Sequence, residues 1–324
     1  MTSRAIVHDS LAVRGGAERV VLAMAAAMPD APIHTSIFAP DRTHSGFAEL
    51  DVRVSALDRV PVLRDDHRRM LPMLSASFRS TAIDADVVVC SSSGFAHHVK
   101  TTGRKIVYCH TPARWLYDSE RYLAKWAAPV RGAALALAKV QRPLDQRAMA
   151  EADLIVANSR HVAGEVEAIY GRSATVVPPC STLELDGPVE PLAGVQAGFV
   201  LTVSRVLGYK RLDVLIDAAR RMPDTTFLHL GGGPHHSSVL EGAPPNLVSH
   251  SGVTDGHLRW AYRHARCAVL TCAEDFGLVP LEADAHGLPV ALPRARGLLD
   301  HDALASGTWS VSYTHLTLPT TPYV

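Results

Sequence analysis

The C-terminal half of the sequence places two basic and two acidic residues at spacings suited to a sugar diphosphate. Arg205 and Lys210 follow an apolar segment that we expect to be a strand. Two fixed cations there can balance a diphosphate whose charge grows as a sugar–phosphate bond breaks. Glu274 follows a second apolar segment, and Glu282 lies in the helix expected after it, where a carboxylate can accept both hydroxyls of a ribose. The helix dipole alone also favours acidic residues in that place, so Glu282 is informative only together with the others.

The loop between the two glutamates is expected to hold the sugar that is transferred. Its side chains and N–H groups follow the carboxyl end of a predicted strand, the edge at which α/β sheets bind ligands. The loop residues concerned are Asp275, Phe276, Gly277 and Leu278.

Two stretches in the N-terminal half could contact the same ligand or its reaction partner. Gly15 and Gly16 lie between a predicted strand and a predicted helix, where glycine lets the backbone approach a phosphate and the helix start supplies N–H groups. A tight strand-to-helix turn would need the same residues. His110 follows a buried strand and could hydrogen-bond a sugar hydroxyl, although the chain has 17 histidines and most histidines have no such role.

Alternating strand-like and helical segments predict an α/β fold with doubly wound parallel sheets. In the first half, the expected helix runs from about Ala17 to Met28, and the strand at Asp86–Cys90 is a near-continuous valine run typical of burial on both faces. The other predicted strands of this half are Ala5–His8, Ile33–Phe38, Asp51–Val54, Lys105–Cys109 and Leu154–Ala157.

The pattern restarts after an aperiodic stretch, Pro178 to Gly198, which contains proline and glycine. We therefore expect two Rossmann-like domains facing a cleft, residues 1–185 and 186–309. Helices are predicted at Arg211–Met222 and Val279–His286. The predicted strands of the second domain are Phe199–Val203, Phe227–Leu230, Cys267–Thr271 and Pro289–Leu292.

The second domain looks incomplete in the sequence. After Leu292 we expect a further helix, a closing strand and a terminal helix, and none is evident. The stretch from Ser310 to Val324 is rich in threonine and proline, has no helical or strand periodicity, and is interpreted as a non-native tail. On this interpretation the chain is C-terminally truncated.

The composition of the chain limits which binding partners and cellular compartments we expect. Lys+Arg and Asp+Glu both number 32, so the zero net charge gives no reason to expect nucleic acid. The five cysteines include no Cys-x-x-Cys pair, which fits a reducing cytosol and argues against a disulfide framework or a zinc site. No apolar run is long enough to cross a membrane. We expect a cytoplasmic protein.

Peripheral contact with the inner face of the cell membrane is a further hypothesis. It rests on basic and aromatic residues that suit anionic lipid and a lipid-linked acceptor. A solvated helix face with ordinary core aromatics would need the same residue types. The residues are Arg64, His67, Arg68, Arg69, Trp115, Tyr117, Tyr122 and Trp126.

Together, the pair Glu274/Glu282 and the pair Arg205/Lys210 resemble the retaining glycosyltransferase family that includes sucrose synthases, bacterial glycogen synthases and many mannosyltransferases. The resemblance runs from residue 5 to about residue 299, and Tyr108–Pro112 and Val177–Pro179 are similar to its mannosyltransferase-type members. It implies the two-domain GT-B fold, with an N-terminal acceptor-binding and a C-terminal nucleotide-sugar-binding domain.

The resemblance also implies a role for each candidate residue. Gly16 would contact donor phosphate or acceptor, and His110 the sugar. Arg205 and Lys210 would bind the diphosphate. The Glu274 loop would hold the hexose and Glu282 the ribose, in a same-face reaction that needs no protein nucleophile.

The resemblance implies a nucleotide-sugar donor as substrate and no separate cofactor. GDP-mannose is favoured, followed by UDP-sugars, and the acceptor would be a glycan or a lipid-linked molecule, as in polysaccharide biosynthesis. Asp84-Ala85-Asp86 imitates a metal-binding Asp-x-Asp, but it precedes a strand instead of following one, so we interpret it as a turn and expect no metal.

Three alternatives remain open on the sequence. A nicotinamide or flavin dehydrogenase needs Gly-x-Gly-x-x-Gly after the first strand, where this chain has only Gly15-Gly16. A GT-B sugar-nucleotide epimerase shares the architecture but has no need of the Glu274/Glu282 pair. A catalytically impaired fragment would bind nucleotide sugar without turnover.

Overall fold

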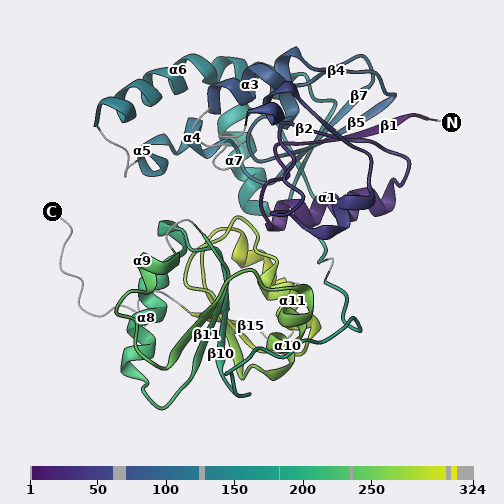
Figure 1. The fold of residues 1–324 in the computed structure, drawn as a ribbon. Coiled ribbons are helices and arrows are strands. Elements are labelled where there is room, and N and C mark those ends of the chain that lie inside the picture. The colour runs from purple at the N-terminus through teal and green to yellow at the C-terminus, as the bar shows by residue number, and fades with distance from the viewer. Residues whose placement is uncertain are drawn as a thin grey trace. The chain divides into compact units, whose positions relative to one another are not determined.

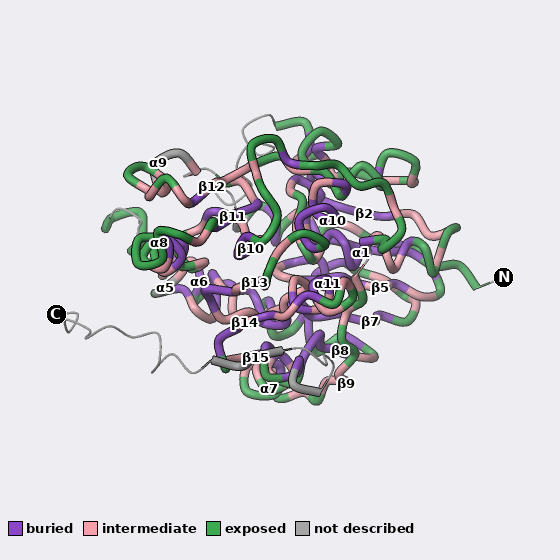
Figure 2. The backbone as a smooth tube through the Cα atoms, turned by 90° about the horizontal axis from the view of Figure 1, so that it is seen from below, coloured by how far each residue is buried: buried purple, intermediate pink, exposed green. Residues whose placement is uncertain are grey.

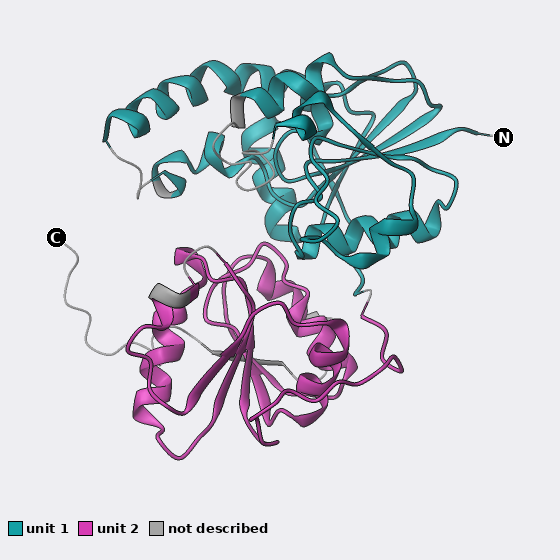
Figure 3. Ribbon diagram, viewed as in Figure 1, with its two compact units in different colours: residues 1–182 teal, residues 183–324 magenta. Residues whose placement is uncertain are grey.

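The structure, a computed structural model, describes residues 2–60, 71–123, 128–181, 183–233, 236–303 and 308–311. The chain divides into two compact units, residues 1–182 (unit 1) and 183–324 (unit 2), shown in Figure 3. Each unit is built on a parallel sheet flanked by helices (Figure 1).

The sheet of unit 1 has the order β3-β2-β1-β5-β7-β8-β9, and the pairs within it are parallel. The central strand β5 pairs with β1 on one side, with Ile6 opposite Val89, and with β7 on the other. The strands are β1 (Arg4–His8), β2 (Ile33–Thr35), β3 (Val52–Val54), β5 (Val87–Ser92), β7 (Arg104–Cys109), β8 (Leu154–Ala157) and β9 (Thr175–Val176), with β4 (Ala82–Ile83) and β6 (Lys100–Thr101) in a separate pair.

Helices connect these strands. The helix after β8 begins where the Ser159 hydroxyl accepts the N–H of Val162 at 3.1 Å, and it ends at Gly171, whose φ of 62° suits glycine. The helices of unit 1 are α1 (Gly16–Ala27), α3 (Leu71–Ser80), α4 (Arg114–Tyr117), α5 (Ser119–Tyr122), α6 (Ala128–Ala150) and α7 (Arg160–Tyr170), with short 3₁₀ turns η1 (Ser45–Glu49), η2 (Ala56–Arg59) and η4 (Ala96–His98).

Unit 2 has a second parallel sheet, in the order β12-β11-β10-β13-β14-β15. Helices α8 and α9 cover one face, and α10 and α11 cover the other (Figure 1). The elements are β10 (Val200–Val203), η5 (Gly208–Lys210), α8 (Leu212–Arg221), β11 (Phe227–Leu230), α9 (His236–Leu240), β12 (Leu247–His250), α10 (Asp255–His264), β13 (Cys267–Val269), α11 (Val279–Ala285), β14 (Val290–Pro293), η6 (Gly297–Ala303) and β15 (Thr308–Val311).

Apolar residues on both faces of each sheet form the core. Along β1, Ala5 and Val7 join the cluster on one face, while Ile6 joins the cluster that packs against α1 on the other. Unit 2 repeats the pattern with one cluster at α8 and one at α10. The strands are accordingly buried while the outer sides of the helices are exposed (Figure 2). This two-sided burial explains the near-continuous valine run of β5.

One strand near the C-terminus was not evident in the sequence. The strand β15 includes Ser310 and Val311 and pairs in parallel with β14, with Val290 opposite Thr308 and Pro293 opposite Val311. The sheet therefore continues beyond Leu292, and the boundary expected at Ser310 falls inside β15. The interpretation of the following residues as a non-native tail stays a prediction. The strand escaped notice because it is only four residues long and is followed by threonine and proline. Residues 312–324 lie outside the described part of the chain.

Candidate functional site

Unit 2 brings one predicted basic residue and one predicted acidic residue into direct contact. Strands β10 and β13 are neighbours, so the segments that follow their carboxyl ends meet at the same edge of the sheet. Lys210, at the end of η5, pairs through Nζ with Oε1 of Glu274, which follows β13. The Thr271 hydroxyl also donates to the backbone carbonyl of Lys210 at 2.6 Å, so the two segments are joined twice.

The Lys210–Glu274 pair is partly buried and charged. Burial by itself would lower the pKa of Lys210, but the Glu274 carboxylate outweighs it and holds that pKa above its ordinary value. Cys272 Sγ lies 3.3 Å from the same Glu274 oxygen and donates to it. Arg205 follows β10 in the same segment as Lys210 and is half-buried, without taking part in this pair.

The loop after Glu274 is fixed by the segment that follows β14. Gly297 N–H donates to the Glu274 carbonyl at 3.1 Å, and Arg296 Nη1 donates to Asp275 Oδ1 at 3.0 Å. A Cβ at Gly297 would lie 1.7 Å from the Asp275 carbonyl oxygen, so only glycine fits there. Gly277 has a φ of 87°, which glycine adopts freely.

The other loop residues complete this anchored turn. Phe276 is buried, and its carbonyl lies 3.0 Å from Nε2 of His301. Leu278 caps the start of α11. The loop is therefore held in one shape by contacts with the β14 side of the sheet, which is the condition for a loop that must position a substrate.

Glu282 lies in α11 as expected, and it is buried to 5 % exposure. The Tyr262 hydroxyl donates to its Oε2 at 2.7 Å, and the Tyr262 ring stacks on His286 at 5.2 Å. Sequence reasoning missed Tyr262, whose only signal is its place on the helix preceding β13.

A second residue that the sequence did not single out is His229, in β11. Its Nε2 lies 2.9 Å from the carbonyl oxygen of Ser204, the residue before Arg205, and its Nδ1 lies 2.8 Å from Ser249 Oγ. Burial lowers the pKa of His229 to about 4, so the ring is neutral and Nε2 carries the hydrogen that the carbonyl accepts. His229 therefore fixes the backbone from which Arg205 projects.

In unit 1, Gly15 and Gly16 lie at the start of α1. Gly15 is the N-cap residue and α1 begins at Gly16. A Cβ at Gly15 would lie 2.4 Å from Oε2 of Glu18, so the Glu18 carboxylate folds back over this glycine. The position between strand and helix is as predicted, and the tight approach explains one of the two glycines without any ligand.

His110 follows β7 and is 8 % exposed. Its backbone is held on both sides, because its N–H donates to the Ser92 carbonyl at 2.9 Å and its carbonyl accepts from Asn158 Nδ2 at 2.9 Å. Its ring nitrogen Nε2 lies 2.8 Å from Ser91 Oγ. The predicted residues Gly15, Gly16 and His110 thus lie after strands of unit 1, and the other predicted site residues lie in unit 2.

The Asp84-Ala85-Asp86 stretch lies before β5, at the other end of that strand from Ser91. The exposed Asp86 carboxylate accepts from Ser3 N at 2.7 Å and from Ser3 Oγ at 2.9 Å. These hydrogen bonds lower the pKa of Asp86. The stretch joins the amino ends of two strands, away from the edge that carries His110.

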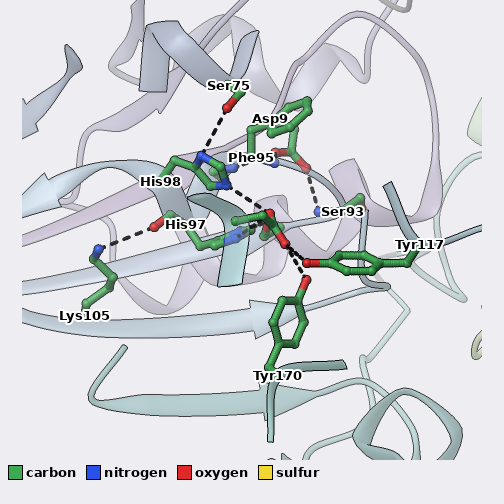
Figure 4. Close-up of polar contacts among 12 residues, drawn as sticks. Asp9, Ser75, Ser93, Phe95, His97, His98, Lys105, Tyr117 and Tyr170 are labelled. Atoms are coloured by element: carbon green, nitrogen blue, oxygen red, sulfur yellow. Dashed lines mark hydrogen bonds and ion pairs between the residues drawn. The ribbon is translucent and has the colours of Figure 1, made fainter. Parts of the chain in front are cut away.

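A buried group of metal-ligand type does occur elsewhere in unit 1. His97 Nε2 and His98 Nε2 lie 3.1 and 2.9 Å from Oδ1 of Asp145, and Tyr117 and Tyr170 donate to its Oδ2 at 2.8 and 2.9 Å (Figure 4). Burial would raise the pKa of Asp145, but the two histidines hold it well below its ordinary range. With both oxygens occupied by donors, we interpret the group as a structural network.

The aromatic half of the membrane hypothesis is not supported where the structure describes it. Trp115 is 5 % exposed and lies in the core cluster, and the Tyr117 hydroxyl is used by Asp145. Tyr122 packs against the same core. For these three residues the structure favours the alternative of ordinary core aromatics. Residues 61–70 and 124–127, with the basic run and Trp126, lie outside the described residues.

Within the described residues, no helix combines the length and apolar character needed to cross a bilayer.

Comparison with known proteins places both units. Residues 14–184, more than half of the chain, match Glycosyltransferase Family 4, and residues 197–308 match Glycosyl transferases group 1. D-inositol 3-phosphate glycosyltransferases from Mycolicibacterium vanbaalenii and Geodermatophilus obscurus are 30 % and 31 % identical over 60 % and 57 % of this chain. The chain spans about half the length of these relatives, 53 % and 51 %.

Solved structures show the same architecture. Anabaena HepE in complex with UDP and glucose has a TM-score of 0.65 at 17 % identity, with 96 % of this chain and 86 % of that one covered. Sucrose-phosphate synthase from Thermosynechococcus elongatus has a TM-score of 0.66 at 16 % identity, with the same coverage. The α/β fold of two Rossmann-like units is therefore that of GT-B glycosyltransferases, and the chain belongs to Glycosyltransferase Family 4.

Proposed function

We propose that this protein transfers a hexose from a nucleotide-sugar donor to an acceptor hydroxyl, with retention of anomeric configuration. The observation that carries the proposal is the meeting of Lys210 with Glu274 at the carboxyl edge of the unit 2 sheet. This contact joins a cation to the start of a rigid loop, and Glu282 follows in α11. Such a group suits a ligand that has both a diphosphate and a sugar.

In the proposed reaction, Arg205 and Lys210 bind the diphosphate, the Glu274–Leu278 loop holds the hexose, and Glu282 accepts the ribose hydroxyls. The acceptor oxygen forms a bond to the anomeric carbon as the bond from that carbon to the phosphate oxygen breaks. The departing phosphate takes the acceptor proton. The cations stabilise the charge that develops on the leaving group, and no metal is required.

The donor is the part of the proposal that a binding experiment can test first. GDP-mannose is the candidate from the sequence resemblance, and UDP-sugars gain support from the fold neighbour that binds UDP and glucose. A thermal-shift series should compare GDP-mannose, UDP-glucose, GDP and UDP. A ligand at a hundred times its dissociation constant stabilises the folded protein by about 2.7 kcal/mol. The absence of a shift with every nucleotide sugar would contradict the proposal.

Two substitutions test the site. Glu282→Gln keeps an oxygen for the Tyr262 hydroxyl and removes the charge, while Lys210→Met keeps the length of the side chain and removes the cation. Each should weaken nucleotide binding about tenfold or more, because a charge-assisted hydrogen bond contributes about 1.5–3 kcal/mol. Arg211→Gln is the matched control for Lys210, since Arg211 pairs with Asp213 at an exposed position. Unchanged affinity in both test variants would remove this site.

The alternative functions can be distinguished by the products that each would form. A sugar-nucleotide epimerase converts the donor without any acceptor, and a catalytically impaired fragment shows donor binding but no transfer. The proposed enzyme releases nucleoside diphosphate only when an acceptor is present, and NMR of the product shows the anomeric configuration of the donor. Activity that survives a chelator supports the metal-free mechanism, and activity lost with the chelator and restored by a divalent cation contradicts it.

The proposed acceptor is a hydroxyl of a glycan, of a lipid-linked molecule or of an inositol phosphate, the last from the name of the relatives. Helix α6 exposes Val130, Val140 and Leu144, which supports peripheral contact with lipid. Co-sedimentation with vesicles should then be stronger with anionic lipid than with neutral lipid. Equal recovery with both would contradict this contact.

A further inference from the structure

Four buried polar side chains of unit 1 form a continuous chain of contacts that ends at His110. His8 Nε2 lies 4.0 Å from Glu18 Oε1, and His8 Nδ1 lies 3.0 Å from both the carbonyl oxygen and the hydroxyl of Ser91. Ser91 Oγ then lies 2.8 Å from His110 Nε2. None of the four residues is more than 8 % exposed.

These contacts come from four separate elements. Glu18 lies in the first turn of α1, His8 ends β1, Ser91 lies in β5 and His110 follows β7. Because β1, β5 and β7 are adjacent and parallel, the polar side chains near their carboxyl ends meet at one edge of the sheet. Buried polar groups are rarely left without hydrogen-bond partners, so four of them in contact at this edge of the sheet require an explanation.

The Ser91 carbonyl sets the direction of the hydrogen bonds. A carbonyl oxygen can only accept, so His8 Nδ1 must carry a hydrogen, and the Ser91 hydroxyl oxygen beside it also accepts. The hydroxyl hydrogen of Ser91 then needs another acceptor, because leaving it unpaired in a buried place is costly. Among the described residues the remaining partner of Ser91 Oγ is His110 Nε2. Nε2 of His110 therefore accepts, and a neutral His110 ring has its hydrogen on Nδ1.

Glu18 favours the same direction of the hydrogen bonds. Burial would lower the pKa of His8, but Glu18, with smaller help from Asp9, raises it above its ordinary value. A protonated His8 carries a hydrogen on both ring nitrogens, so the raised pKa favours the direction that the Ser91 carbonyl sets. The Glu18 carboxylate lies over Gly15, where a Cβ would collide with it.

We propose that Glu18, His8 and Ser91 are positioning residues that lock the His110 ring with Nε2 as acceptor and Nδ1 as donor. In the neutral ring, Nδ1 can then only donate a hydrogen bond, to a sugar hydroxyl or to another acceptor. The catalytic part of the inference rests on the proposed function, because it assumes that His110 contacts the sugar. The locked tautomer itself does not.

The tautomer is measured by NMR of the full-length protein labelled with ¹⁵N at the histidine rings, with the His110 signals assigned by their loss in His110→Gln. In the unsubstituted protein, His110 should show a protonated Nδ1 and an unprotonated Nε2. Ser91→Ala should allow a protonated Nε2 form to appear. Ser92→Ala is the matched control, since Ser92 lies next to Ser91 and its hydroxyl contacts His97 instead.

Transfer kinetics test the consequence for the reaction. Ser91→Ala and Glu18→Gln should lower kcat about tenfold to a hundredfold, in line with the cost of a misplaced group, and leave nucleotide affinity unchanged. Glu49→Gln, at an exposed position, is the control for Glu18→Gln. In a His110→Ala background, Ser91→Ala should have no further effect, because it acts only through His110.

The outcomes separate the two proposals. A protonated Nε2 on His110 in the unsubstituted protein contradicts the locked tautomer, whatever reaction the protein catalyses. An unchanged His110 tautomer in Ser91→Ala contradicts it as well. The proposal is also overturned if Ser91→Ala lowers kcat as much in the His110→Ala background as in the unsubstituted protein. Ser91 would then act on the reaction without His110. If the protein shows the expected tautomers but transfers no sugar, the result supports the locked tautomer and contradicts the proposed function.

Discussion

At the scale of single residues, the half-buried Asp9 and the buried Asp145 of unit 1 accept hydrogen bonds from groups that would otherwise be unpaired. Asp9 accepts three backbone N–H groups, from Ser93 at 2.6 Å and from Phe95 and Ala96 at 2.7 Å. It thereby fixes the turn that follows β5 and carries the histidines of the Asp145 network (Figure 4). Asp9 and Asp145 thus connect loop and helix segments to one another, which stabilises the segments that follow β5.

The Asp145 network leads to a stability prediction. Asp145→Asn should lower the free energy of unfolding by about 3 kcal/mol or more, because it breaks a buried ionic network and leaves donors without their acceptor. Thermal and denaturant unfolding measure the change. Glu167→Gln removes the same charge at an exposed position of α7 and should change stability by about 0.5 kcal/mol or less.

The same substitution has a defined pH dependence. The pKa of Asp145 is lowered on folding, so its contribution is fully present above the ordinary value of 3.8 and is lost as the pH falls through the folded-state pKa. The stability gap between the unsubstituted protein and Asp145→Asn should therefore be constant near neutral pH and narrow below about pH 4. A gap that widens in acid would mean that Asp145 is not ionised in the folded protein.

At the scale of elements, the sequence predicts well those segments whose pattern depends on burial alone. The valine run of β5 and the apolar β7 and β8 are expected within one or two residues of their observed bounds. Strand β12 and helix α10 were not expected. Leu247–His250 has two polar residues, and α10 begins with Asp255-Gly256, so neither shows a clear apolar period. Their place is decided by pairing and packing with β11 and β10.

The candidate site likewise contains residues that the sequence locates and partners that it does not. Strand ends locate Lys210, Glu274 and His110, because a parallel sheet collects its carboxyl ends at one edge. Partners such as Tyr262 for Glu282 and Ser91 for His110 could not be predicted. These contacts depend on which strands and helices are neighbours, and local sequence does not determine the order of strands in a sheet.

The closing strand β15 carries an element-scale prediction. Deleting residues 308–324 should lower the stability of unit 2 by about 2 kcal/mol or more, because β14 loses its backbone partners. It should also promote aggregation, since an unpaired parallel edge can pair with another chain. Deleting only residues 312–324 is the control that keeps β15. Melting temperature and light scattering measure both effects, and equal behaviour of the two deletions would mean that β15 does not stabilise the sheet.

At the scale of the whole molecule, the candidate residues divide by unit. Each unit has apolar clusters on both faces of its own sheet, so each can keep its own site edge in shape. The residues proposed to bind the nucleotide and diphosphate belong to unit 2, and His110 and Gly16 belong to unit 1. The contribution of each unit to binding and transfer can therefore be tested separately.

Hydrogen–deuterium exchange can show this separation directly. Addition of the nucleoside diphosphate alone should slow exchange after β10, around Lys210, and from Glu274 through α11, because bound phosphate and ribose stabilise these segments. The protected segments should lose this response in Glu282→Gln and retain it in His110→Ala, whose substitution lies in unit 1. Transfer should fall in both variants. Protection that appears only in unit 1, or that disappears in His110→Ala, would contradict the assignment of the nucleotide to unit 2.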